Sequence, residues 1–289
     1  MSTLYVVATP IGNLEDMSPR ALRVLKEADL ILAEDTRVTR KLLSAFQIKT
    51  PLESHHQHNE GVKAAAVIAR MQEQPLQVAL VSDAGTPAIS DPGARLVAAA
   101  HEAGIQVVVV PGPSAMAAAL SKSGFEEASF AFYGFLPRKQ SELKERLAAL
   151  QQGPPLAVLY ESPHRVLALL TAIAAIYPGI SISVSRELTK VHEQTLNGSV
   201  ESVLAAFQQE EGLLRGEFAL VLALPPAASP ATEDPLSLEA LLVDQVTKGA
   251  GLREAQAALI QAGHRKNAVY AAALNLKQLA AGHLTDSRN

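Results

Sequence analysis

The stretch VSDAGTPAISDPG, residues 81–93, ends an apolar run in dense turn chemistry. Two glycines, two prolines, two aspartates and three hydroxyl residues separate that run from an alanine-rich helical pattern. The pair Asp91-Pro92 is typical of a helix start, because aspartate caps and proline fits the first helical position. We therefore expect Asp91 to be a structural N-cap and the rest of the loop to serve another purpose.

The composition limits what kind of protein this is. A chain of 289 residues has room for about two domains. It contains no cysteine, which excludes disulfides, Cys-ligated zinc and a thiol nucleophile and fits a reducing cytoplasm. The first residues lack the pattern of a signal peptide, and no apolar run is long enough for a membrane span. The formal net charge of −4 means that nucleic-acid binding would require a local basic face.

The first part of the chain alternates strands and helices. Continuous apolar runs, typical of parallel strands buried on both faces, predict strands at 4–8, 30–33, 76–81 and 105–110, with a weaker one at 51–53. Ser18-Pro19 predicts a helix start, and Gly104 falls where the glycine after a helix belongs. Residues 1–120 are therefore expected to form an N-terminal α/β domain with a mainly parallel sheet.

A second α/β domain is expected over residues 121–225. Its predicted strands are 130–135, 156–160, 180–185 and 217–224, and its predicted helices are 141–150, 163–176 and 200–210. Residues 226–235 are rich in Pro, Ala and Ser and predict a linker. Residues 236–289 predict a C-terminal helical module. Within it, 252–274 fits either a helix-turn-helix-like element or an amphipathic helix pair that packs on the main body.

Four turn-rich loops follow strands of the first domain, at 9–13, 34–37, 81–93 and 111–115. The carboxyl ends of parallel strands meet at one edge of a sheet, where open α/β folds bind ligands. The chain has neither G-x-G-x-x-G nor a Walker A motif in these loops. They offer a carboxylate, small hydroxyls and apolar walls, which suit a ligand with an amine, ribose hydroxyls and little negative charge. S-adenosylmethionine has these features.

Seven motifs in order resemble the ribosomal RNA small subunit methyltransferase I family, a branch of the tetrapyrrole methylases. They are VATPIGNLEDMSPRA (7–21), ILAEDTR (31–37), VSDAGTPAISDPG (81–93), PGPSA (111–115), LYESPHR (159–165), RELTK (186–190) and GEFALV (216–221). The resemblance implies 2′-O-methylation of a cytidine ribose in the decoding region of 16S rRNA, with S-adenosylmethionine as donor. It also implies two α/β domains with the cofactor in the cleft between them, a small C-terminal helical module, and a homodimer in the cytoplasm that acts on the small ribosomal subunit.

The resemblance also implies which residues hold the cofactor. On the first-domain side they are Pro10, Asp83, Ala84, Pro87, Ile89, Ser90, Ser114 and Ala115. On the second-domain side they are Leu136, Glu161, Leu188 and Phe218. The first loop, TPIGN, departs from the glycine-rich loop of tetrapyrrole-modifying members, which favours an RNA substrate over a porphyrinoid.

Methyl transfer to a hydroxyl requires that the reacting atoms be aligned, and a base that takes the hydroxyl proton accelerates it. Glu161 and Asp35 are the candidate catalytic residues, and Glu34, His55, His56 and His164 also remain open. No metal is expected, because the adjacent histidines of HHQH (55–58) lack the spacing of a good site. Candidate RNA-binding residues are Arg37, Arg40, Lys41, Arg165, Arg265 and Lys266, although each cluster could equally be a solvated helix face.

Two other functions remain open on the sequence. A small-molecule methylase of the tetrapyrrole type would have a roomy apolar substrate cavity and no response to RNA. A non-catalytic ribosome-assembly factor would keep the cofactor pocket as a structural element. The motifs EDTR and YESPHR favour the RNA methyltransferase over the small-molecule enzyme.

Overall fold

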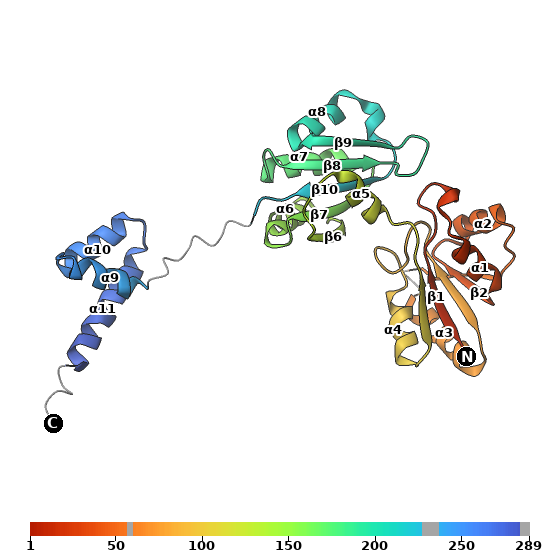
Figure 1. The fold of residues 1–289 in the computed structure, drawn as a ribbon, viewed down its shortest axis with the longest axis horizontal. Helices are drawn as coiled ribbons and strands as arrows, with labels where there is room; N and C mark the ends of the chain where they lie inside the picture. The colour runs from red at the N-terminus through yellow and green to blue at the C-terminus, as the bar shows by residue number, and fades with distance from the viewer. Residues whose placement is uncertain (57–59, 227–236, 284–289) are drawn as a thin grey trace. The chain divides into compact units, whose positions relative to one another are not determined.

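The computed structural model describes residues 1–56, 60–226 and 237–283 (Figure 1). The chain divides into two compact units, Met1–Pro226 and Ala227–Asn289. The first unit contains two five-stranded sheets, each with its own helices. Apart from Pro226, the predicted linker at 226–235 lies outside the described residues, as does the end of the predicted C-terminal module.

The first sheet is entirely parallel, as the continuous apolar runs predicted. Its strand order is β3-β2-β4-β1-β5. The strands are β1 (Thr3–Val7), β2 (Leu30–Ala33), β3 (Leu52–Ser54), β4 (Gln77–Val81) and β5 (Gln106–Val110). Each lies within one residue of its predicted bounds. The carboxyl ends of β1, β2, β4 and β5 therefore share one edge.

Helices cover both faces of this sheet. Helices α1 (Pro19–Glu27) and α2 (Thr36–Ala45) pack on one face, and α3 (Glu60–Glu73) and α4 (Ala94–Glu102) pack on the other. The short 3₁₀ helix η1 (Leu14–Asp16) precedes α1. The hydroxyl of Ser18 accepts a hydrogen bond from the backbone N–H of Ala21, which confirms the predicted start of α1.

The predicted cap of α4 is wrong. Helix α4 begins at Ala94, and its N-cap is Gly93, with φ of 133°. The carboxylate of Glu60 on α3 accepts hydrogen bonds from the backbone N–H groups of Gly93 (2.9 Å) and Arg95 (3.1 Å). An acceptor from a neighbouring helix thus replaces the local one, and Asp91 is left two residues before the cap.

The second sheet is mixed, with strand order β6-β7-β10-β8-β9. Only β6 and β7 are parallel; the remaining pairs are antiparallel. The strands are β6 (Phe130–Phe135), β7 (Leu156–Glu161), β8 (Ser181–Arg186), β9 (Gln194–Ser199) and β10 (Phe218–Ala223). Strand β9 is missing from the sequence-based prediction, because its sequence QTLNGS is polar and sits at an edge of the sheet.

One face of the second sheet carries α6 (Gln140–Ala149), α7 (Val166–Ile176) and α8 (Val200–Gln209), with η2 (Leu150–Gln152) beside them. Helix α5 (Ala115–Ser123) packs on the other face, against residues of β7 and β10. A third 3₁₀ helix, η3 (Glu211–Leu214), precedes β10. The face that carries α5 also contacts the loop after β1, through Ile11.

The C-terminal unit is helical, as predicted. It contains α9 (Leu238–Thr247), α10 (Leu252–Gln261) and α11 (Lys266–His283), packed around Leu242, Leu259 and Val269. Gly263, with φ of 101°, makes the turn between α10 and α11, as the helix-turn-helix pattern predicted. Across the described part of the chain, no helix combines the length and the apolar character that a membrane crossing requires.

Candidate active site

Hydrogen bonds join the loops at the edge of the first sheet. Thr9 and Gly85 exchange two backbone hydrogen bonds, which link the loop after β1 to the loop after β4. The hydroxyl of Thr86 donates to the carbonyl oxygen of Pro113 at 3.2 Å, which links the loop after β4 to the loop after β5. The predicted ligand loops are therefore one connected structure.

The loop after β8 reaches the same place from the second sheet. Glu187 and Thr189 have φ of 50° and 65°, a conformation that costs free energy in non-glycine residues. The ammonium of Lys190 holds this turn by bonding to Glu187 (2.8 Å) and Glu217 (3.0 Å). A side chain at Gly12, in the loop after β1, would collide with Lys190 and Thr189. The loop after β1 and the loop after β8 therefore approach each other closely at Gly12, where only a glycine fits.

A cavity of about 380 Å³ lies where these loops meet. Its lining comes from both sheets and is mainly apolar. Eight of the predicted cofactor residues line it: Ala84, Ile89, Ser90, Ser114, Ala115, Glu161, Leu188 and Phe218. The other four, Pro10, Asp83, Pro87 and Leu136, lie outside the lining. Ten lining residues were not among the predictions: Ile11, Gly85, Thr86, Asp91, Phe135, Tyr160, Ser162, Pro163, Glu217 and Ala219.

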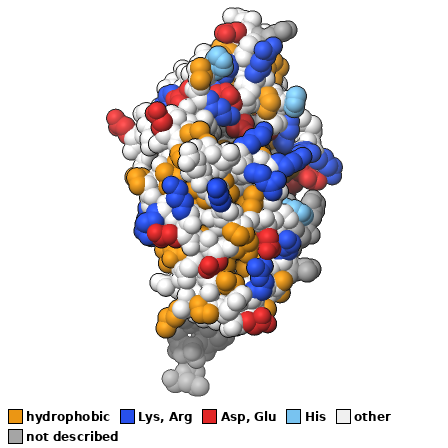
Figure 2. Space-filling model, turned by 90° about the vertical axis from the view of Figure 1, so that its right-hand side faces the viewer, with side chains coloured by type: hydrophobic (Ala, Val, Ile, Leu, Met, Phe, Trp, Pro, Cys, Tyr) orange, Lys and Arg blue, Asp and Glu red, His pale blue; other side chains and the backbone are white. Residues whose placement is uncertain are grey.

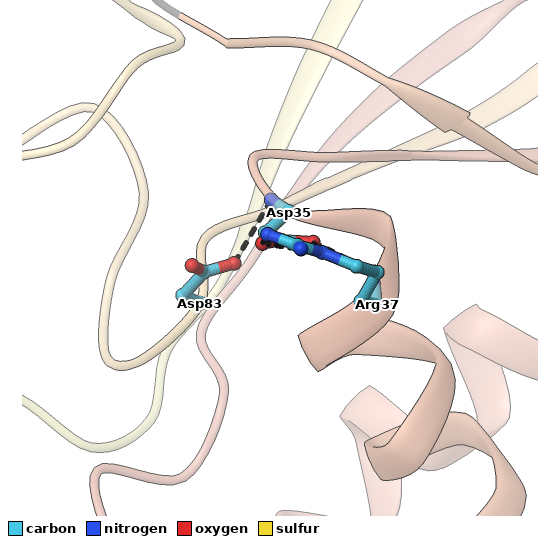
Figure 3. Close-up of polar contacts among 3 residues, drawn as sticks. All are labelled: Asp35, Arg37 and Asp83. Atoms are coloured by element: carbon cyan, nitrogen blue, oxygen red, sulfur yellow. Dashed lines mark hydrogen bonds and ion pairs between the residues drawn. The ribbon is translucent and has the colours of Figure 1, made fainter.

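Asp83 is occupied within the protein (Figure 3). Its Oδ1 accepts a hydrogen bond from the backbone N–H of Asp35 at 3.0 Å. Asp35 in turn caps α2 through the N–H of Arg37 and receives the guanidinium of Arg37, with 2.6 Å between Nη2 and Oδ2. These contacts lower the pKa of Asp35 to about 2. A carboxylate with so low a pKa is a weak proton acceptor, so this geometry disfavours Asp35 as a general base.

Glu161 is buried at the end of β7 and pairs with Arg165. Its Oε1 accepts from the backbone N–H of Ser162 at 2.7 Å. Its Oε2 lies 3.2 Å from Nη2 of Arg165 without hydrogen-bond alignment. The same Nη2 donates to the carbonyl oxygens of Leu136 and Pro137. Arg165 therefore fixes the loop after β6, and its guanidinium is committed inside the protein.

Asp91 is the lining carboxylate that the sequence-based interpretation misplaced. Burial raises its pKa, the Ser82 hydroxyl opposes the rise, and the charge of Asp83 adds to it. Burial likewise raises the pKa of Glu34, which feels the charges of Asp91 and Asp83 as well. No capping role in α4 occupies Asp91. Its proximity to Asp83 and Glu34 in the fold, rather than its local sequence, reveals it as a candidate functional group.

The histidines lie elsewhere. His55 is buried, neither ring nitrogen has a hydrogen-bond partner, and burial lowers its pKa. His164 is exposed and, like His55 and His56, lies outside the cavity lining. Among the described residues, no three His, Asp or Glu side chains are arranged to hold a metal ion. His58, the last residue of the HHQH motif, is outside the described residues.

The predicted RNA-binding residues differ in their surroundings. Arg37 is exposed but paired with Asp35. Arg40 and Lys41 are exposed on α2, and Arg265 and Lys266 are exposed at the start of α11. On the face that Figure 2 shows, Lys and Arg side chains are spread among acidic and hydrophobic ones, with one group of basic side chains on the right-hand side. Of the six, only Arg165 has a partly buried guanidinium held by backbone carbonyls.

The first unit consists of two linked α/β sheets, and residues of both line one cavity. Sequence comparison identifies the family that has this architecture. The family model described as Tetrapyrrole (Corrin/Porphyrin) Methylases matches residues 3–204. The chain belongs to the tetrapyrrole methylase family. It is a methyltransferase that depends on S-adenosylmethionine, as the sequence predicted.

The chain is similar over most of its length to curated relatives. It is 49% identical over 224 residues to the Synechocystis sp. protein named Ribosomal RNA small subunit methyltransferase I, covering 77% of this chain and 79% of that protein. It is 43% identical over 275 residues to the Pseudomonas aeruginosa protein of the same name, covering 94% and 96%. The structure resembles uroporphyrin-III C-methyltransferase from Thermus thermophilus complexed with S-adenyl homocysteine. The TM-score is 0.53, with 18% identity, over 77% of this chain and 97% of that one, a likeness in fold.

Proposed function

We propose that this protein transfers a methyl group from S-adenosylmethionine to the 2′-hydroxyl of a cytidine in 16S rRNA, in the decoding region of the small ribosomal subunit. The observation that carries the proposal is the cavity of about 380 Å³ between the two sheets. The sequence similarity supports an rRNA substrate in the small subunit, because the relatives named Ribosomal RNA small subunit methyltransferase I match 77% and 94% of the chain.

The residues of the cavity fit the donor. Apolar side chains, including Ile11, Leu188 and Phe218, suit the adenine and the methylene groups. Ser114 and Ala115 are the N-cap and first residue of α5, and the positive end of a helix favours a carboxylate. The carboxylate of Glu217, which also pairs with Lys190, can accept a hydrogen bond from an ammonium. The lining has no lysine or arginine and suits a ligand without phosphate.

When bound, the donor supplies a methyl carbon that accepts the ribose oxygen while the carbon–sulfur bond breaks and its electron pair stays on sulfur. The protein must align the reacting atoms, exclude water and take the hydroxyl proton. The connected loops after β1, β4 and β5 serve alignment, because their mutual hydrogen bonds fix the cavity wall before ligands bind.

The structure favours Asp91 to take the hydroxyl proton. It lines the cavity, and its raised pKa makes it a better proton acceptor than an ordinary aspartate. Glu161 also lines the cavity, but its carboxylate is paired with the guanidinium of Arg165 and accepts from the backbone N–H of Ser162. Asp35 is held by Arg37 and serves as a cap. We therefore assign Glu161 and Asp35 supporting roles and Asp91 the role of base.

RNA would be bound by exposed cations outside the cavity. Arg40 and Lys41 on α2 follow the loop after β2, close in sequence to Asp35 and Glu34. Arg265 and Lys266 would add contacts from the C-terminal unit. A homodimer and a cytoplasmic location belong to the same proposal: the absence of cysteine fits a reducing compartment, and the substrate is a ribosomal subunit.

The decisive experiment incubates the purified protein with methyl-labelled donor and small subunits that lack the modification, then maps ribose methylation. We expect label at one cytidine ribose of the decoding region. A tetrapyrrole substrate in a parallel reaction tests the small-molecule alternative. Label on the tetrapyrrole alone, or on neither substrate, would refute the proposed function.

A further inference from the structure

Strand β6 carries three phenylalanines on one face of the second sheet. Phe130 pairs with Leu156, Phe132 with Val158, and Phe135 with Tyr160 across the β6–β7 ladder. Phe132 and Phe135 are three residues apart, so in a regular strand they would point to opposite faces. Their pairing places them on the same face, next to Tyr160.

A β-bulge between Phe132 and Gly134 makes this possible. Gly134 has φ of 60°, which a glycine adopts without strain. Tyr133, the extra residue, packs on the opposite face, with the guanidinium carbon of Arg146 at 5.2 Å from its ring centre. Bulges occur next to active sites because they redirect a side chain. Here the redirected side chain is Phe135.

The result is an aromatic series that ends at the cavity. The ring centres of Phe132 and Tyr160 are 4.9 Å apart, and those of Tyr160 and Phe135 are 5.9 Å apart, both edge to face. Tyr160 and Phe135 line the cavity. Phe135 is 59% exposed, because β6 is an edge strand and its pairing with β7 places Tyr160 beside Phe135 on one side only. An aromatic ring that lines a cavity, contacts one neighbouring ring and is otherwise exposed can take another planar group on its free face.

We infer that Phe135 stacks on the base of the nucleotide whose ribose is methylated. The inference rests on the proposed function and names a residue that would position its substrate. Its general chemistry, an aromatic ring for a nucleobase, also suits the adenine of the donor. The RNA base is favoured, because a donor enclosed by the buried walls leaves an exposed rim residue for the second substrate. Stacking tolerates any base, so Phe135 anchors the nucleotide rather than selecting cytidine.

The test compares Phe135→Leu and Phe135→Ala with Phe135→Tyr and Phe135→Trp. Methylation of unmodified small subunits is measured at saturating donor, and donor affinity is measured separately by calorimetry. We expect the leucine and alanine variants to raise the KM for subunits by about tenfold, the effect of losing one stacked base. The tyrosine and tryptophan variants should retain the parental KM, and all four should retain donor affinity.

Phe130→Leu is the matched control, because Phe130 is exposed on the same strand and face but lies outside the cavity lining. It should leave the KM unchanged. An unchanged KM in Phe135→Leu would overturn the inference. Loss of donor affinity in that variant would also overturn it and assign the ring to the adenine. If the parent protein methylates no subunits, the proposed function itself fails, an outcome distinct from a parent that is active and indifferent to Phe135.

Discussion

The carboxylate of Asp83, after β4, accepts a hydrogen bond from the backbone N–H of Asp35, after β2, with 3.0 Å between the two atoms. This bond joins two ligand-edge loops that are 48 residues apart in the chain. The carboxylate of Asp83 therefore has a structural role, and Asp83 lies outside the cavity lining.

Replacing Asp83 should therefore loosen the loop at 34–37. In Asp83→Ala the Asp35 N–H loses its acceptor, which should lower the free energy of unfolding by about 1–3 kcal/mol. Amide hydrogen exchange in a peptide covering 34–37 should become faster. Asp83→Asn keeps an oxygen acceptor and is the control: its exchange should stay close to the parental rate. Equal exchange in the two variants would show that this hydrogen bond does not hold the loop.

The ion pair of Asp35 and Arg37 predicts a pH dependence at the acid end. The folded pKa of Asp35, about 2, is below its ordinary value of 3.8, so the unfolded chain binds this proton more readily. The stabilising contribution is therefore complete above about pH 4 and is lost as pH falls from 3.8 towards 2. An NMR titration of the Asp35 carboxyl measures this directly. Arg37→Gln should raise the pKa of Asp35, and an unchanged midpoint would contradict the assignment to Arg37.

Asp91→Asn should impair chemistry while preserving the fold. Gly93 and Glu60 cap α4, so the thermal unfolding temperature should change little. If Asp91 takes the hydroxyl proton, the single-turnover rate should fall by about 10²–10⁴-fold. The rate of the parent protein should fall as the pH is lowered, because Asp91 becomes protonated with a pKa above its ordinary value of 3.8. Glu161→Gln is the comparison variant, because Glu161 also lines the cavity but is paired with Arg165. An acid limb that persists in Asp91→Asn would exclude Asp91 as its source.

The sequence predicts most of the fold because the strands are buried runs bounded by strong turn residues. Strands β6 and β10, for example, begin and end within one residue of the prediction. The failures have physical causes. Strand β9 is a polar edge strand without a hydrophobic pattern, and the start of α4 depends on Glu60, which is 33 residues from Gly93.

The cavity is predicted in part, for a similar reason. Ser114 and Phe218 follow from motif resemblance, since each stands in a recognisable segment. Phe135 does not, because its direction depends on a bulge at Gly134 that changes which face each side chain occupies. Asp91 carries a local signal that points the wrong way: Asp-Pro favours a cap, and only the tertiary structure supplies the competing one.

Exposed cations on α2 should control RNA affinity. The double variant Arg40→Ala, Lys41→Ala should weaken binding to RNA and reduce the dependence of log K on log salt by about 1.4, the value for two contacts to single-stranded phosphates. Arg37→Ala should have a smaller effect, because Asp35 already pairs with that guanidinium. Lys144→Ala on α6 is an exposed control. Binding measured over a series of salt concentrations gives each slope, and parallel lines for parent and double variant would argue against phosphate contacts.

A chain that ends at Pro226 should fold and bind S-adenosylmethionine with unchanged affinity. The cavity lining is complete by Ala219, and the first unit ends at Pro226. The C-terminal unit packs around its own core residues. Its removal should therefore leave the core of the first unit intact. We expect truncation to reduce methylation of assembled subunits, because Arg265 and Lys266 present exposed charge at the start of α11.

The full-length variant Arg265→Ala, Lys266→Ala separates charge from packing. If the unit grips the ribosome, this variant should lose activity on subunits, as the truncated chain does, while its unfolding temperature and donor affinity stay parental. If the unit only stabilises the α/β body, truncation should lower the unfolding temperature and donor binding together, and the charge variant should remain active. Full activity of the truncated chain on subunits would refute a gripping role, because no contact from the C-terminal unit would then be required for methylation.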